Sequence, residues 1–403
     1  MRLAATCATS GLAASLALLG CGRDAEPAAY VPIVVEAPSR DAQGGPNAFD
    51  AYVKLAGRAV SASVQFDQRD TPDARRRALA ELEPLLEELA EATALPCSFR
   101  YSPVPPFEPR PHHEGWLVLG RAVVWRAEAA TNDQDWPEAV RWTVVATTFG
   151  IDLGGGAAAD ASLGYGILDA ARAVIGPHLP TMPAEELESL ADGLSAALLR
   201  LPEAEQTLGN EGAAMLASVK ALQDAHRDGT LGRFAKGFHQ RSRRAVEGLQ
   251  SLDGAERQAF FRSLLDERES VLGQLKERSV EPAFRRGPVK YGLSGDLRVL
   301  ASQFFKTGEP WMSMRDLSVA RTRLLTVTAF LDAQIAATGA APPNLGGIKP
   351  TLCIDPYTHH AFGYLPRERG FLVYSYGTDG KDDRGDTDGE RTSPDVLLED
   401  AAL

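Results

Sequence analysis

Apolar side chains recur every three or four residues from about residue 49 to residue 281, which is the spacing of one face of an α-helix. Clear stripes of this kind cover Ala78–Leu89, Leu187–Leu201 and Phe260–Leu275. The third stripe shares its segment with many Arg and Glu residues, as expected for a helix with one buried face and one solvated face. The pattern predicts a mainly α-helical region.

Two apolar segments, Trp116–Ala130 and Trp136–Phe149, are separated by the polar run 132–135. Asn and Asp are favourable N-cap residues, so this break predicts the start of a second helix. The pair resembles one tetratricopeptide-type hairpin. Because repeat stacks need three or more copies to bury a continuous core, and we see one, we expect an irregular helical bundle with a single such hairpin.

The pattern changes over residues 287–315, where Gly and Pro punctuate the chain and indicate a domain boundary. An apolar stripe over 316–335, followed by Gly339, predicts a long helix. Alternating segments at Ala361–Leu365 and Phe371–Tyr376 predict an antiparallel hairpin that covers one side of this helix. The expected fold is mainly α, with a small C-terminal α+β module.

The first 21 residues look like a secretory signal peptide, because Arg2 precedes an apolar run that is too short to span a bilayer. The run ends in Leu-Leu-Gly-Cys at Cys21, which resembles the lipobox of bacterial lipoproteins. That resemblance implies a lipid on Cys21. Since Gly22 rather than Asp follows, it implies attachment to the outer membrane, facing the periplasm. An ordinary cleaved signal is the alternative.

Composition is ordinary for a globular protein, with 44% hydrophobic and 24% charged residues. The net charge of −12 argues against a nucleic-acid partner. The region after the signal is rich in Ala, Pro, Gly and Asp, which indicates a tether. The expected organisation is a signal peptide (1–20), a tether (21–48), a helical domain (49–286), a linker (287–315), a C-terminal module (316–391) and a tail (392–403).

Two thiols remain if Cys7 leaves with the signal and Cys21 is acylated, namely Cys97 and Cys353. An oxidising periplasm permits a disulfide between them, and two separate thiols are the alternative. The chain has no C-x-x-C motif, so the cysteines indicate neither a zinc ribbon nor a thioredoxin-like site.

An acidic loop directly follows the second expected strand, with six acidic residues among the twelve from 379 to 390. They are Asp379, Asp382, Asp383, Asp386, Asp388 and Glu390. Hard oxygen ligands on a Gly-rich loop suit Ca²⁺, although the spacing is not that of an EF-hand. A solvated acidic segment, neutralised by neighbouring Lys and Arg, is the alternative.

The last fifth of the chain resembles the globular part of the major pseudopilin of type II secretion. The resemblance covers about residues 316–390 and is most specific in Asp-Pro-Tyr at 355–357 and Tyr-Ser-Tyr-Gly-Thr-Asp-Gly at 374–380. It implies a calcium ion in the loop after the last strand.

The resemblance also implies which residues bind that ion. Asp379 matches the first ligand, and Asp386 and Asp388 lie near the paired acidic ligands of the family. The family has that pair adjacent, whereas Thr387 intervenes here, so Asp382 and Asp383 are competing candidates.

The chain departs from a pseudopilin at its N-terminal end, where it has neither a prepilin-peptidase site nor a long apolar helix. It is therefore not expected to assemble as a pilus subunit. The combination of a lipobox, a helical domain and this C-terminal module resembles a broad group of uncharacterised bacterial envelope proteins, in which the helical domain is partly tetratricopeptide-like.

These features favour a non-enzymatic, lipid-anchored envelope protein whose module contacts an unidentified envelope protein. The alternatives are a metal-dependent hydrolase that uses the acidic loop and a periplasmic carrier of a small apolar ligand. We expect no metal site at the adjacent pairs His112-His113 and His359-His360, because neighbouring side chains point in different directions. The three glycines at 154–156 are expected to form a turn between helices.

Overall fold

The computed structural model describes residues 33–34, 45–61, 71–99, 103–305, 308–367, 370–385 and 395–398. Within these ranges the chain forms twelve α-helices and one two-stranded antiparallel sheet, which confirms the predicted fold class. Cys21, Asp386 and Asp388 lie outside the described residues, so lipidation and two of the five expected metal ligands stay predictions.

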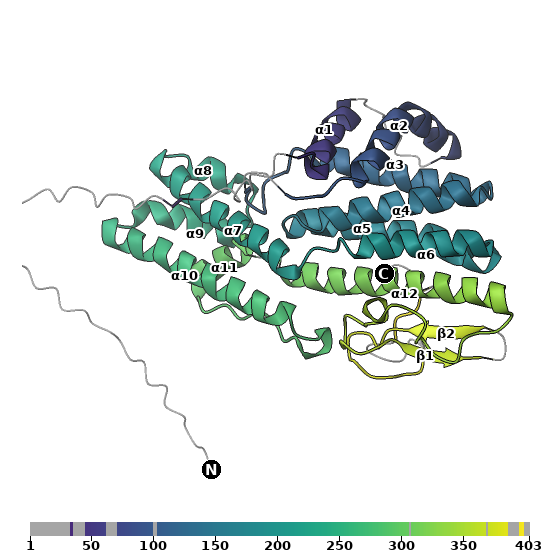
Figure 1. The fold of residues 1–403 in the computed structure, drawn as a ribbon. Helices are drawn as coiled ribbons and strands as arrows, with labels where there is room; N and C mark the ends of the chain where they lie inside the picture. The colour runs from purple at the N-terminus through teal and green to yellow at the C-terminus, as the bar shows by residue number, and fades with distance from the viewer. Residues whose placement is uncertain are drawn as a thin grey trace, which may run out of the picture.

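Six helices of the first half lie in stacked layers above the long helix α12 (Figure 1). They are α1 (Ala48–Ser61), α2 (Pro72–Thr93), α3 (His113–Asn132), α4 (Trp136–Leu153), α5 (Ala158–Ile175) and α6 (Ala184–Leu198). The helices α3 and α4 form the predicted hairpin. The Asp135 carboxylate caps α4 by accepting a hydrogen bond from the backbone N–H of Glu138 at 3.4 Å.

A second group of helices extends to one side of these layers (Figure 1). It contains α7 (Ala204–Arg227), α8 (Leu231–Phe234), α9 (Gln240–Gly248), α10 (Gly254–Ser279) and α11 (Gly295–Phe304). Short 3₁₀ turns occur at Gly176–Thr181, Ala235–Gly237, Leu249–Ser251, Ala283–Arg285 and Pro350–Leu352. In the described part of the chain, no helix combines the length and apolarity needed to cross a bilayer.

The helix α12 (Gly308–Thr338) joins the two predicted parts of the protein. It begins before the expected start at residue 316, and Trp311 and Met312 are buried in the helical core. The expected linker over 287–315 therefore contains α11 and the first turns of α12. The helix ends where predicted, before Gly339, which has the positive φ of a C-terminal cap.

The C-terminal hairpin consists of β1 (Gly363–Pro366) and β2 (Phe371–Tyr374), paired antiparallel. One hydrophobic cluster contains Val373 of β2 together with Leu324 and Leu331 of α12. The opposite side of α12 packs on α5 and α6. The hairpin thus covers the long helix, as the alternating sequence predicts, and α12 holds the module directly against the helical layers.

Candidate functional site

The C-terminal module is organised around Asp355, which has no solvent exposure. Its Oδ1 accepts hydrogen bonds from the Tyr357 backbone N–H at 3.0 Å and the Ser375 hydroxyl at 2.8 Å. Its Oδ2 accepts from the Thr358 hydroxyl at 3.3 Å and the Tyr376 backbone N–H at 2.9 Å. The two motifs behind the pseudopilin resemblance therefore meet at one buried carboxylate.

The acidic loop begins directly after this anchor, and three of its predicted ligands are described. Asp379 Oδ1 accepts a hydrogen bond from the backbone N–H of Lys381 at 3.0 Å, and the Lys381 ammonium lies 3.5 Å from Oδ2. Asp382 Oδ1 accepts from the Tyr374 hydroxyl at 2.7 Å. Within the described ranges, Asp379, Asp382 and Asp383 do not bring three ligand atoms together at metal-binding distance.

Asp395 reaches back into this loop from the expected tail and was not among the predicted ligands. Its side chain is buried, and Oδ2 accepts hydrogen bonds from the backbone N–H groups of Asp383 at 3.1 Å and Gly385 at 2.8 Å. Its Oδ1 is buried and accepts no hydrogen bond from the described residues. Burial raises the pKa of Asp395 to about 6, and the negative charges of Asp383 and Asp382 add to this effect.

The position of Asp395 follows from a backbone bridge. The Val396 N–H donates to the Ser375 carbonyl at 2.9 Å, and the Ser375 N–H donates to the Val396 carbonyl at 3.0 Å. This bridge places the carboxylate of Asp395, the residue before Val396, against the acidic loop. The sequence contained only a weak signal for this contact. Asp395 stands next to the apolar Val396, in a segment that otherwise has the composition of a tail.

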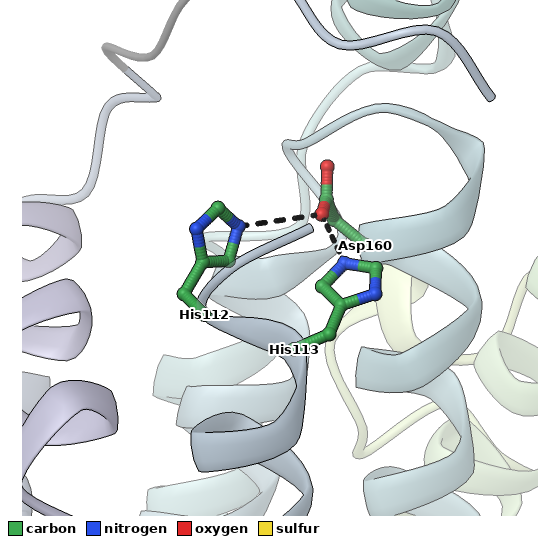
Figure 2. A group of neighbouring side chains, drawn as sticks. All are labelled: His112, His113 and Asp160. Carbon is green, nitrogen blue, oxygen red and sulfur yellow. Dashed lines mark hydrogen bonds and ion pairs between the residues drawn. The ribbon is translucent and has the colours of Figure 1, made fainter. Parts of the chain in front are cut away.

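A second group of side chains, for which the sequence predicted no metal site, lies at the N-terminal ends of α3 and α5. His113 Nε2 lies 2.6 Å from Asp160 Oδ1, and His112 Nε2 lies 3.8 Å from the same oxygen. Figure 2 shows this oxygen between the two rings. Adjacent side chains start in different directions, but here both rings reach the same oxygen of Asp160. Both start at the beginning of α3, where a carboxylate from another helix can lie between them.

Asp160 is held firmly in this position. It is fully buried at the third residue of α5, and its Oδ2 accepts hydrogen bonds from Arg110 Nη1 at 2.8 Å and from the Ala157 backbone N–H at 2.9 Å. A Cβ at Gly156 would lie 2.5 Å from Asp160 Cβ, so this position requires glycine. The glycines at 154–156 connect α4 to α5, which confirms the predicted turn.

The two predicted thiols are both free cysteines in the structure. Cys97 packs against the cluster that includes α1, α2 and α3, whereas Cys353 belongs to the cluster between α12 and the hairpin. Of the two interpretations left open by the sequence, the structure has the separate thiols.

A hollow of about 630 Å³ lies in the second group of helices. Phe107, Phe234 and Phe238 line it together with Arg233 and Glu108. The rings of Phe107 and Phe238 meet edge to face, with centroids 5.1 Å apart. The hollow is open to solvent and has charged as well as aromatic walls, so it is not the enclosed apolar pocket that a carrier of an apolar ligand needs.

The chain was also compared with known proteins. No protein-family model, curated protein or solved structure matches it, so support for a function comes from the geometry of its own residues.

Proposed function

We propose that the chain is a non-enzymatic, lipid-anchored protein of the bacterial envelope whose C-terminal module contacts a protein partner and holds a calcium ion in the loop after β2. The module is suited to present a defined surface, because α12 packs on α5 and α6 with one side and on the hairpin with the other. An ion that orders the loop would complete that surface.

The buried Oδ1 of Asp395 is the observation that carries the calcium proposal. A buried carboxylate oxygen without a hydrogen bond is costly unless a cation or a proton compensates it. The negative charges of Asp382 and Asp383 act on the same group. The ligand atoms of Asp395, Asp382 and Asp383 do not lie together within metal-binding distance in the described part of the chain. We assign these three residues as ligands that the ion draws together, with Asp379 and the undescribed Asp386 and Asp388 completing the set of hard oxygen donors.

In this assignment the ion has a structural role. Calcium supplies the positive charge that lets several carboxylates ionise next to one another, and its binding energy adds to the stability of the folded module. The chain's own groups set the geometry, because the N–H groups of Asp383 and Gly385 orient the Asp395 carboxylate through Oδ2.

Thermal unfolding with millimolar Ca²⁺ and then with excess chelator tests this function. We expect calcium to raise the transition temperature of the wild type and to leave that of Asp395→Asn unchanged, because the amide keeps an acceptor for the two N–H donors but removes the charge. Asp192→Asn, at an exposed position on α6, is the matched control and should respond like the wild type. Equal calcium responses in wild type and Asp395→Asn would contradict the assignment.

The membrane anchor is tested separately, by fractionation of cells that express the wild type or Cys21→Ser. We expect the wild type in the membrane fraction and the variant in the soluble fraction. Membrane retention of the variant would refute lipidation at this position.

The carrier alternative is tested at the hollow beside Phe107, which is open to solvent and lined by aromatic and charged side chains. If the chain is a carrier, an apolar fluorescent dye, a naphthalene sulfonate, should bind the wild type and lose affinity in Phe234→Ala. Leu199→Ala serves as a control at an exposed apolar side chain. Identical dye binding by all three proteins would remove this candidate. No observation on the described residues favours the hydrolase alternative.

A further inference from the structure

We propose that His112, His113 and Asp160 form a binding site for one divalent transition-metal ion of the zinc type, independent of the proposed calcium loop. One ring nitrogen of each histidine and a carboxylate oxygen of Asp160 all lie within 4.8 Å of one another. Figure 2 shows the three side chains converging from the ends of two helices. Within the described ranges, it is the one group of three or more His, Cys, Asp or Glu side chains whose ligand atoms lie this close together.

The spacing of the three atoms suits a metal. A zinc ion roughly 2.1 Å from each of two tetrahedral ligands requires those ligands to be roughly 3.4 Å apart. The two observed nitrogen-to-oxygen distances, 2.6 Å for His113 and 3.8 Å for His112, lie on either side of this value, and the shorter one is a hydrogen bond that the ion would replace. Small rotations of the two imidazole rings would therefore seat the ion.

The chemistry of the donors selects the kind of metal. Two imidazole nitrogens and one carboxylate oxygen suit zinc and its neighbours in the first transition series, whereas calcium and magnesium prefer oxygen donors alone. Three protein ligands leave a coordination position for water or another small ligand. The side chain of His113 is 24% exposed, which gives the ion a path from solvent.

The groups around the ligands hold them in place. Arg110 and the Ala157 N–H both donate to Oδ2 of Asp160, which leaves Oδ1 directed at the histidines. The His112 ring packs on the buried Trp116 ring, with centroids 4.0 Å apart. The fold therefore holds the three side chains together without a metal.

The positive charge of Arg110 beside the carboxylate opposes cation binding, and a second buried acid offsets it. Glu211 Oε2 accepts a hydrogen bond from the Ala158 backbone N–H at 3.0 Å, one residue from the N–H that Asp160 accepts. The first N–H groups of α5 thus donate to two buried carboxyl groups, Asp160 of α5 itself and Glu211 of α7. Their negative charge compensates the guanidinium and favours uptake of a cation.

Titration of the metal-free full-length chain with Co²⁺ alone tests this site, because Co²⁺ takes zinc sites and its visible absorption reports on coordination by nitrogen. We expect one equivalent to bind with new visible bands and to be displaced by Zn²⁺. His112→Phe keeps a ring on Trp116 but removes Nε2, and we expect its affinity for Co²⁺ to fall by about tenfold or more. His113→Gln should show the same loss.

The chain supplies its own matched control. His359 and His360 are an adjacent, exposed pair outside the cluster, so the double variant His359→Ala/His360→Ala removes two imidazoles and should bind Co²⁺ like the wild type. Thermal unfolding without metal checks that each variant is folded. Wild-type affinity in both His112→Phe and His113→Gln, or a loss of affinity confined to the control, would overturn the proposal.

Discussion

The two candidate cation sites differ in what holds their ligands. Asp160 and its histidines lie at the ends of packed helices, and the carboxylate is fixed by Arg110 and a backbone N–H. Asp395 meets the acidic loop across a single backbone bridge, and its orientation depends on two N–H groups of that same loop. The contacts of Asp160 therefore contribute to the fold without any metal, whereas in our proposal the acidic loop is completed only by its ion.

Of the substitutions that test this difference, the replacement of Asp160 should have the largest effect on stability. Asp160→Ala leaves the buried Arg110 guanidinium without its carboxylate and removes the cap of α5, so we expect the free energy of unfolding to fall by about 3–5 kcal/mol without any metal. Chemical denaturation by urea measures this. Asp192→Ala, on the exposed side of α6, should stay within about 0.5 kcal/mol of the wild type. A similar small effect for Asp160→Ala would show that the cluster does not support the fold.

The anchor of the module gives the next largest effect. Asp355→Ala leaves four donors without their acceptor in a buried position, and we expect a loss of about 2–3 kcal/mol. The calcium response should weaken with it, because Asp355 positions Ser375 through its hydroxyl, and the backbone of Ser375 forms the bridge to Val396 beside Asp395. Urea denaturation with and without calcium measures both. An unchanged calcium response would show that the loop does not depend on Asp355. Glu188→Ala, at an exposed position of α6, controls for the loss of an acidic side chain.

The calcium loop should depend on pH. Burial raises the pKa of Asp395 to about 6 in the folded chain, so its protonated form contributes stability that is lost as pH rises through about 6. Calcium replaces the proton, and its stabilising effect should be small near pH ~5 and full above pH ~7. Asp152 and Asp332 also have pKa values raised to about 6, so the informative quantity is the difference between wild type and Asp395→Asn in thermal unfolding. A difference that does not change with pH would remove Asp395 from the ion site.

Local patterns were sufficient for most of the fold. The hairpin of α3 and α4 follows from apolar spacing and from Asp135 as a cap, and the end of α12 follows from Gly339. The start of α12 was not predicted, because Gly308 and Pro310 are usually helix breakers while the buried Trp311 gains its packing only from distant helices. Tertiary burial there outweighs local propensity.

The sites were less predictable than the fold. Asp160 is 47 residues from His113, and no local pattern reports that α5 begins beside the start of α3. Asp395 lies in a segment whose single strand-like contact, Ser375 with Val396, joins it to a residue far along the chain. Asp379, Asp382 and Asp383 could be predicted as candidate ligands, because they are close together in the sequence.

Equilibrium dialysis against Ca²⁺ and Zn²⁺ together, with elemental analysis of the bound ions, tests the independence of the two sites most directly. We expect the wild type to hold one ion of each kind, Asp395→Asn to lose calcium but keep zinc, and His112→Phe to lose zinc but keep calcium. If either variant lost both ions, or if neither lost any, the proposal of two independent sites with different ligand chemistry would be contradicted.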